Sequence, residues 1–133
     1  MKQITQLSHI VPLATIVILL VGDATAAQSS VRLKSGKEVK VVKVGSVYGQ
    51  GMKKLAVELQ YETELKVSDL AALRQEADQV WEVFQPEVEK ANEKTAIVSA
   101  VEKRPPGVVT KSEGYNFVFE KRADGTWHCL DDK

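Results

Sequence analysis

The stretch GSVYGQGMKK, residues 45–54 of this 133-residue chain, has the residue types that most suggest a binding function. Three glycines surround a tyrosine, and two lysines follow. Glycine-rich loops bind phosphate when free backbone N–H groups face the anion and a helix N-terminus follows. Here a strand pattern follows, and the spacings GxGxxG and GxxxxGK[ST] are both absent. The segment is therefore interpreted as a long hairpin connection in which glycine permits positive φ.

The same connection could also form a binding lip at the end of a rigid sheet. Tyr48 would present a flat ring, and Lys53 and Lys54 would attract an anion. These three residues are the candidate site. The partner that they favour is an unidentified protein or an anionic component of a cell envelope.

His128 and Cys129 are adjacent, as a nucleophile and its base would be in some hydrolases. On a strand, however, neighbouring side chains point to opposite faces, so these two cannot act on the same atom. The other histidine, His9, falls in a leader segment described below. One histidine and one cysteine are too few for a zinc site of the usual composition, and no calcium-loop motif is present. We expect Cys129 to be a small buried hydrophobe, and we predict no metal and no cofactor.

Paired-carboxylate catalysis needs a pocket as well as the acids, and no sequence feature gathers the acids of this chain into one. We therefore predict no catalytic residues and no enzyme activity. Nucleic acid is not expected as a partner, because the formal net charge is zero and no basic stripe with interleaved aromatics occurs. The acidic residues of the central helical segment fall mostly off its apolar stripe and are expected to form a solvated face: Glu76, Asp78, Glu82, Glu87, Glu89 and Glu93.

The N-terminus has the features of a secretory signal peptide. Lys2 precedes an apolar run at residues 10–22, and Ala24-Thr25-Ala26 follows as a cleavage signal. The alternative is a retained membrane anchor, but a spanning helix needs about 20 apolar residues, and polar residues and a proline interrupt this run. We predict a cleaved leader, residues 1–26, and no stable membrane insertion afterwards.

A single cysteine allows no intramolecular disulfide, and residues 27–133 hold no Asn-x-Ser/Thr sequon. Both features favour a bacterial periplasmic or secreted protein. Charges are also sorted along the chain: residues 31–54 hold seven basic residues against one acid, and residues 58–93 hold ten acids against three basic residues. This asymmetry indicates either two elements that attract each other or a basic face for an anionic partner.

Period-two alternation across residues 31–44 predicts a β-hairpin with its turn at Ser35-Gly36. The doubled valine, Val41-Val42, shifts the alternation, as a β-bulge does.

The period then changes to 3.6, which predicts an amphipathic helix from about Asp69 to Gln85. Ser68 or Asp69 supplies the N-cap. Pro86 is expected to kink the helix or restart it for a further turn or two, to Ala91.

Further strands are predicted at residues 55–63 and 95–102, and a last hairpin at residues 114–130 turns at Asp124-Gly125. Residues 27–133 thus form one α+β domain, in the order β-β-β-α-β-β-β, with an antiparallel sheet of five to six strands packed on one long helix. The aromatic side chains should meet between sheet and helix, where they either fill the core or line a ligand cavity: Trp81, Phe84, Tyr115, Phe117, Phe119 and Trp127.

The ending F-x-F followed by D-G-T-W, within residues 114–130, resembles the closing hairpin of curved-sheet domains of the NTF2-like and cystatin-like groups. The preceding element order departs from the helix-first arrangement of those groups. Neither their ligand pockets nor their inhibitory loops are therefore transferred to this chain, and no family is assigned.

The leading functional hypothesis is an exported, non-enzymatic binding domain. Two alternatives stay open: a small-ligand carrier or weak enzyme with a pocket between helix and sheet, and an inhibitor or immunity-type protein directed against a secreted enzyme.

Overall fold

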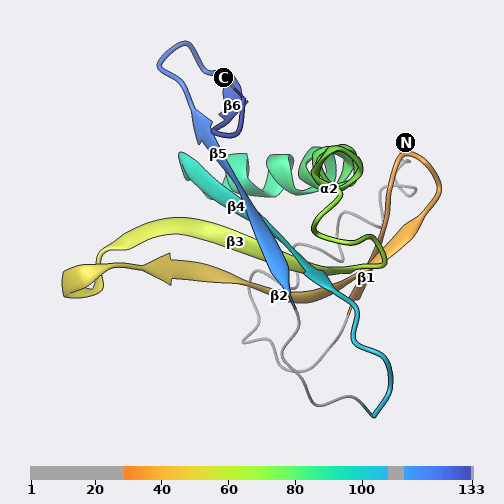
Figure 1. The fold of residues 1–133 in the computed structure, drawn as a ribbon. Helices are drawn as coiled ribbons and strands as arrows, with labels where there is room; N and C mark the ends of the chain where they lie inside the picture. The colour runs from red at the N-terminus through yellow and green to blue at the C-terminus, as the bar shows by residue number, and fades with distance from the viewer. Residues whose placement is uncertain (1–28, 108–112, 133) are drawn as a thin grey trace, which may run out of the picture.

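The computed structural model describes residues 29–107 and 113–132; the predicted leader, residues 1–26, lies outside them. One six-stranded sheet carries one long helix on one of its faces (Figure 1). The elements are β1 (Ser29–Arg32), β2 (Glu38–Tyr48), β3 (Lys54–Thr63), α2 (Leu70–Lys90), β4 (Thr95–Glu102), β5 (Gly114–Lys121) and β6 (Trp127–Cys129), with a single 3-10 turn at Gln50–Met52. The predicted α+β class and element order are confirmed.

The strands lie in the sheet in their sequence order, β1 to β6. The prediction of a purely antiparallel sheet is wrong, because β3 and β4 run parallel from Val57↔Ala96 to Thr63↔Glu102. The reason is the connection between them. α2 packs back along the sheet, so the chain re-enters at the end where β3 began, and the next strand must point the same way.

The first hairpin forms as predicted. The backbone N–H of Leu33 donates to the carbonyl of Lys37 at 2.7 Å across the turn. The bulge is also confirmed: Val41 pairs with Tyr61 and Lys43 with Gln60, which leaves Val42 as the extra residue of β2.

Asp69 caps α2, since its Oδ1 accepts a hydrogen bond from the backbone N–H of Ala72 at 3.3 Å. The expected extent to about Ala91 is confirmed, but the alternative of a restart at Pro86 is wrong, because α2 continues through Pro86 to Lys90 as one element. Phe84 and Val88 are both buried on the sheet, on either side of the proline. Their packing offsets the one backbone hydrogen bond that proline cannot donate.

The aromatic side chains pack together at the helix–sheet interface, as the core-filling alternative expects. The ring of Trp81 stacks on Phe119 with 4.4 Å between centroids and 7° between planes, and it meets Trp127 edge-on at 5.0 Å. Cys129 is buried beside this cluster, in agreement with its predicted role as a hydrophobe. Tyr115 is only partly buried.

Candidate functional site

The β2–β3 hairpin extends beyond the rest of the sheet as a two-stranded projection. β4 pairs with β3 no further than Val57, and within the part of the chain that the structure describes β1 pairs with β2 no further than Val41. We call the intervening residues, 42–56, the arm. In Figure 1 the arm is the gold and yellow hairpin that reaches past the ends of β4 and β5.

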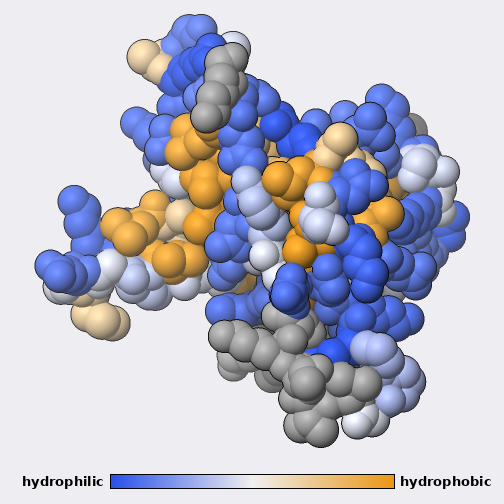
Figure 2. Space-filling view, in the orientation of Figure 1, coloured by the Kyte–Doolittle hydropathy of each residue, from blue (hydrophilic) through white to orange (hydrophobic). Residues whose placement is uncertain are grey.

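The end of the arm exposes large apolar side chains. Tyr48 is 53% exposed, Met52 78% and Leu55 55%. Figure 2 shows hydrophobic surface along the arm between hydrophilic neighbours. Alternation along the strand predicted at residues 55–63 puts Leu55 on the same face as the buried Leu59, yet Leu55 is exposed. The reason is that Leu55 lies beyond the last β3–β4 pair, where the sheet no longer has its neighbouring strand.

The turn of the arm has a defined backbone. The N–H of Gly49 donates to the carbonyl of Lys53 at 2.8 Å, and residues between them form the 3-10 turn. A Cβ at Gly49 would lie 2.9 Å from the Cδ1 of Leu55, so this glycine lets the leucine side chain pack over the turn. Gly51 has φ +70°, as the positive-φ role of glycine in this segment predicts.

Met52 also adopts a left-handed conformation, with φ +60°. Side chains with a Cβ rarely do so, because the conformation costs roughly 1–2 kcal/mol. A residue that carries this cost and leaves its side chain in solvent is a candidate for function. Met52 is not among the predicted site residues, although its place between Gly51 and Lys53 at the expected turn is a signal visible in the sequence.

The two candidate lysines have different surroundings. The Nζ of Lys54 donates to Oε2 of Glu93 at 2.5 Å, so its charge is paired with the loop before β4. The side chain of Lys53 is exposed and has no ion pair with the described part of the chain. Nearer the sheet, Lys43 lies 3.8 Å from Glu58. Two of the three predicted site residues, Tyr48 and Lys53, are exposed at the end of the arm, as are Met52 and Leu55. The third, Lys54, forms an ion pair with Glu93 on the body of the protein.

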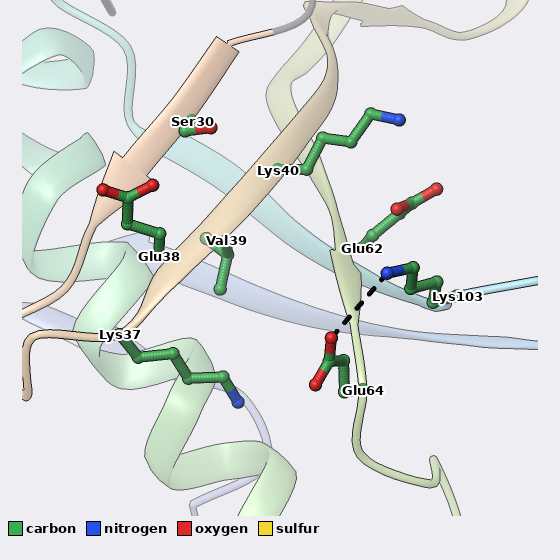
Figure 3. Close-up of a pocket in the computed structure, with 8 residues that line it drawn as sticks. All are labelled: Ser30, Lys37, Glu38, Val39, Lys40, Glu62, Glu64 and Lys103. Atoms are coloured by element: carbon green, nitrogen blue, oxygen red, sulfur yellow. Dashed lines mark ion pairs between the residues drawn. The ribbon is translucent and has the colours of Figure 1, made fainter.

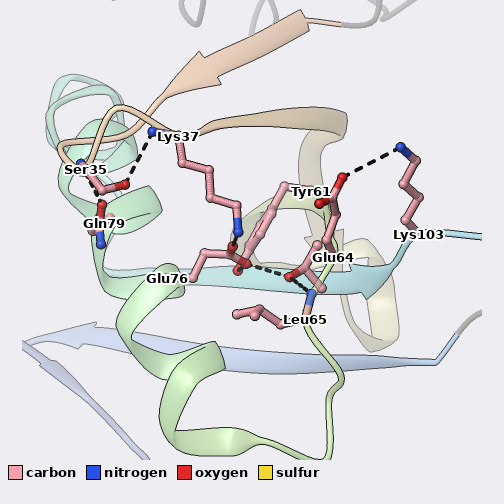
Figure 4. A network of polar contacts seen from close by, with 9 residues as sticks. Ser35, Lys37, Tyr61, Glu64, Leu65, Glu76, Gln79 and Lys103 are labelled. Carbon is pink, nitrogen blue, oxygen red and sulfur yellow. Dashed lines mark hydrogen bonds and ion pairs between the residues drawn. The ribbon is translucent and has the colours of Figure 1, made fainter.

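Away from the arm, a carboxylate network connects the first hairpin to α2 (Figure 4). Glu76 is 5% exposed, and it accepts hydrogen bonds from Thr63 Oγ1 at 2.6 Å, Lys37 Nζ at 2.5 Å and Tyr61 Oη at 3.0 Å. Burial and the neighbouring carboxylate raise the pKa of Tyr61 far above its usual value, so this hydroxyl keeps its proton and donates.

The expectation of a wholly solvated acidic helix face is thus wrong for Glu76. It is also wrong for Glu87, which is 2% exposed and lies 3.8 Å from Lys90 Nζ. Both residues follow the buried side of α2 with Leu73 and Val80. Spacing along the helix did not predict this burial; the donors on β3 and the first hairpin hold Glu76 inward.

The two larger surface hollows of the described residues lie on the body of the protein. The first, of about 370 Å³, is lined by Ser30, Val39, three lysines (Lys37, Lys40, Lys103) and three glutamates (Glu38, Glu62, Glu64) (Figure 3). Its charges balance, and Glu64 lies 3.8 Å from Lys103, so the hollow does not select an ion of either sign. The second, of about 520 Å³, crosses the sheet face beside Gln60, Ser99 and Asn116. Neither hollow is lined by Trp81 or Phe119.

Within the described ranges, no group of three or more histidine, cysteine or acidic side chains is arranged to hold a metal ion. In the same ranges, no helix has the length and hydropathy needed to cross a membrane. Neither a protein-family model, nor a curated protein, nor a solved structure matches this chain. The arm therefore remains the candidate site on its geometry alone.

Proposed function

We propose that this protein is an exported, non-enzymatic binding domain that engages its partner through the tip of the arm. The observation that carries the proposal is the exposure of Tyr48, Met52 and Leu55 at the end of a projecting hairpin, beside the unpaired Lys53. Elsewhere in the described chain the exposed large apolar residues Leu70 and Leu130 lie singly. Clustered exposed apolar side chains mark interaction sites more often than isolated ones.

Site-specific photo-crosslinking in the producing cells tests the proposal. A photoreactive phenylalanine analogue replaces Met52 in one strain and Leu130 in a control strain. We expect crosslinked products with envelope components at position 52 and few at position 130. Equal products at both positions, or none at position 52, would show that the arm is not the binding site.

One observation supports the inhibitor hypothesis as a second candidate. The arm is only two strands wide and convex at its end, a shape that suits insertion into the cleft of a secreted enzyme. A crosslinked product at position 52 that proves to be a hydrolase, inhibited by the purified protein, would favour this candidate. The carrier hypothesis gains no such support, because Trp81 and Phe119 stack on each other in the core.

A further inference from the structure

We infer that the arm tip binds the headgroup region of an anionic lipid surface. The inference rests on the proposed function and names the class of partner. It applies to side chains at the tip, the part of the arm from Tyr48 to Leu55.

The shape and side chains of the tip favour lipid over a folded protein. Specific protein interfaces add about one hydrogen bond per 100–200 Å² and require a complementary pocket on the partner. The tip side chains that can form hydrogen bonds are few: the hydroxyl of Tyr48, Gln50 and the lysines. A lipid interface needs no matching pocket, because headgroups rearrange around a convex apolar tip.

The order of residues at the tip also matches the layers of a lipid interface. Met52, the most exposed of the large apolar side chains, lies at the turn itself. Tyr48 lies at the end of β2, one layer back; tyrosine is enriched at headgroup depth, where its ring is apolar and its hydroxyl is hydrated. The hydrogen bond between Gly49 and Lys53 holds the turn closed before contact, which lowers the ordering cost of binding.

Charge supplies the preference for anionic lipid. Residues 39–57 contain four lysines and no Asp or Glu. Glu58 and Glu93 offset Lys43 and Lys54 from outside this segment, and Lys40 lies in the charge-balanced first hollow. Lys53 is therefore the uncompensated charge beside the apolar side chains. Its long stem can follow the apolar tip while the ammonium reaches the phosphate level.

Vesicle co-sedimentation tests the inference on the protein purified as cells produce it. All variants share one N-terminus, so differences between them report the substituted residue. Vesicles contain phosphatidylglycerol with phosphatidylcholine, or phosphatidylcholine alone. We expect tighter binding to the phosphatidylglycerol vesicles and a further loss at high salt. Lys53→Glu should weaken that binding by at least about fivefold, since each lysine near an anionic surface contributes on that scale.

Two tip variants isolate the apolar contribution. Met52→Ser combined with Tyr48→Ser should weaken binding to both vesicle types by at least about tenfold. Met52→Gly removes the side chain while relieving the positive φ, so it keeps the fold and should also weaken binding. The matched controls, Leu130→Ser for an exposed apolar residue and Lys34→Glu for a hairpin-turn lysine, should bind as the wild type does.

The outcomes separate this inference from the proposed function. Failure of the wild type to sediment with either vesicle overturns the lipid inference, and so does an equal loss in tip and control variants. If crosslinking at position 52 nevertheless yields a protein, the binding function of the arm stands and its partner is a protein. If crosslinking fails as well, both proposals fall.

Discussion

The hydroxyl of Tyr61 donates a hydrogen bond of 3.0 Å to the carboxylate of Glu76, which joins β3 to α2 at a buried point. Lys37 and Thr63 complete the site, so one carboxylate on α2 receives one donor from the first hairpin and two from β3. A buried carboxylate is tolerated when its oxygens are satisfied in this way.

Glu76→Ala should therefore destabilise the protein strongly. The change leaves Tyr61 and Thr63 without their acceptor in a buried site, and a loss of about 2 kcal/mol in the free energy of unfolding is expected. Denaturant unfolding measures it. The matched control is Glu82→Ala on the exposed side of the same helix, which should change the free energy of unfolding by less than about 0.5 kcal/mol. Equal losses in the two variants would contradict the stabilising role of the hydrogen bonds to Glu76.

Gly51→Ala should destabilise the arm turn, whereas Gly45→Ala should not. Gly51 has φ +70°, where a Cβ costs roughly 1–2 kcal/mol. Gly45 lies in β2 without positive φ, and a Cβ there would meet nothing within 4 Å. Alanine at Gly45 is therefore expected to be neutral or to stabilise by about 0.5 kcal/mol. Thermal unfolding of the two single variants decides whether the turn geometry is as described.

The C-terminal residues attach to α2 through an ion pair whose contribution depends on pH. Arg74 donates to both carboxylate oxygens of Asp132, at 2.8 and 3.2 Å, and this lowers the pKa of Asp132 below its usual 3.8. A lowered folded-state pKa stabilises the fold above the unfolded pKa, and the effect is lost as the pH falls through the folded value.

Asp132→Asn should accordingly reduce the melting temperature at pH 7, and the difference from the wild type should shrink as the pH falls below the usual carboxyl pKa of 3.8. Because Asp132 is exposed, the change is expected to be small and to diminish with added salt. Glu120→Gln, an exposed carboxylate on β5, serves as the control. A constant difference between Asp132→Asn and wild type at all pH values would show that the ion pair is not its cause.

Cys129 should react slowly with thiol reagents in the native protein. The residue is 2% exposed, and burial raises the pKa of its thiol, so both access and thiolate content are reduced. The reaction with a chromogenic disulfide at pH 8 is expected to be at least about a hundredfold slower than in guanidinium, since it must await local opening. A rapid native reaction would place the thiol outside the core.

The sequence alone determined the local structure of this protein. The two-residue period of β2, the 3.6-residue period of α2, the cap at Asp69 and the bulge at Val42 each follow from neighbouring residues, because backbone geometry and side-chain alternation act over a few positions. The burial of Cys129 and the role of glycine at the arm turn were likewise accessible from residue type.

Only the tertiary structure decided relations between distant segments. The parallel pairing of β3 with β4 depends on where α2 packs, and the continuation of α2 past Pro86 depends on the burial of Phe84 and Val88. Glu76 is buried because three donors from other elements reach it, and Lys54 is paired because Glu93 lies beside it. The exposure of Leu55 depends on where β4 begins. Such contacts join residues far apart in the chain, and no local pattern specifies which of them will meet.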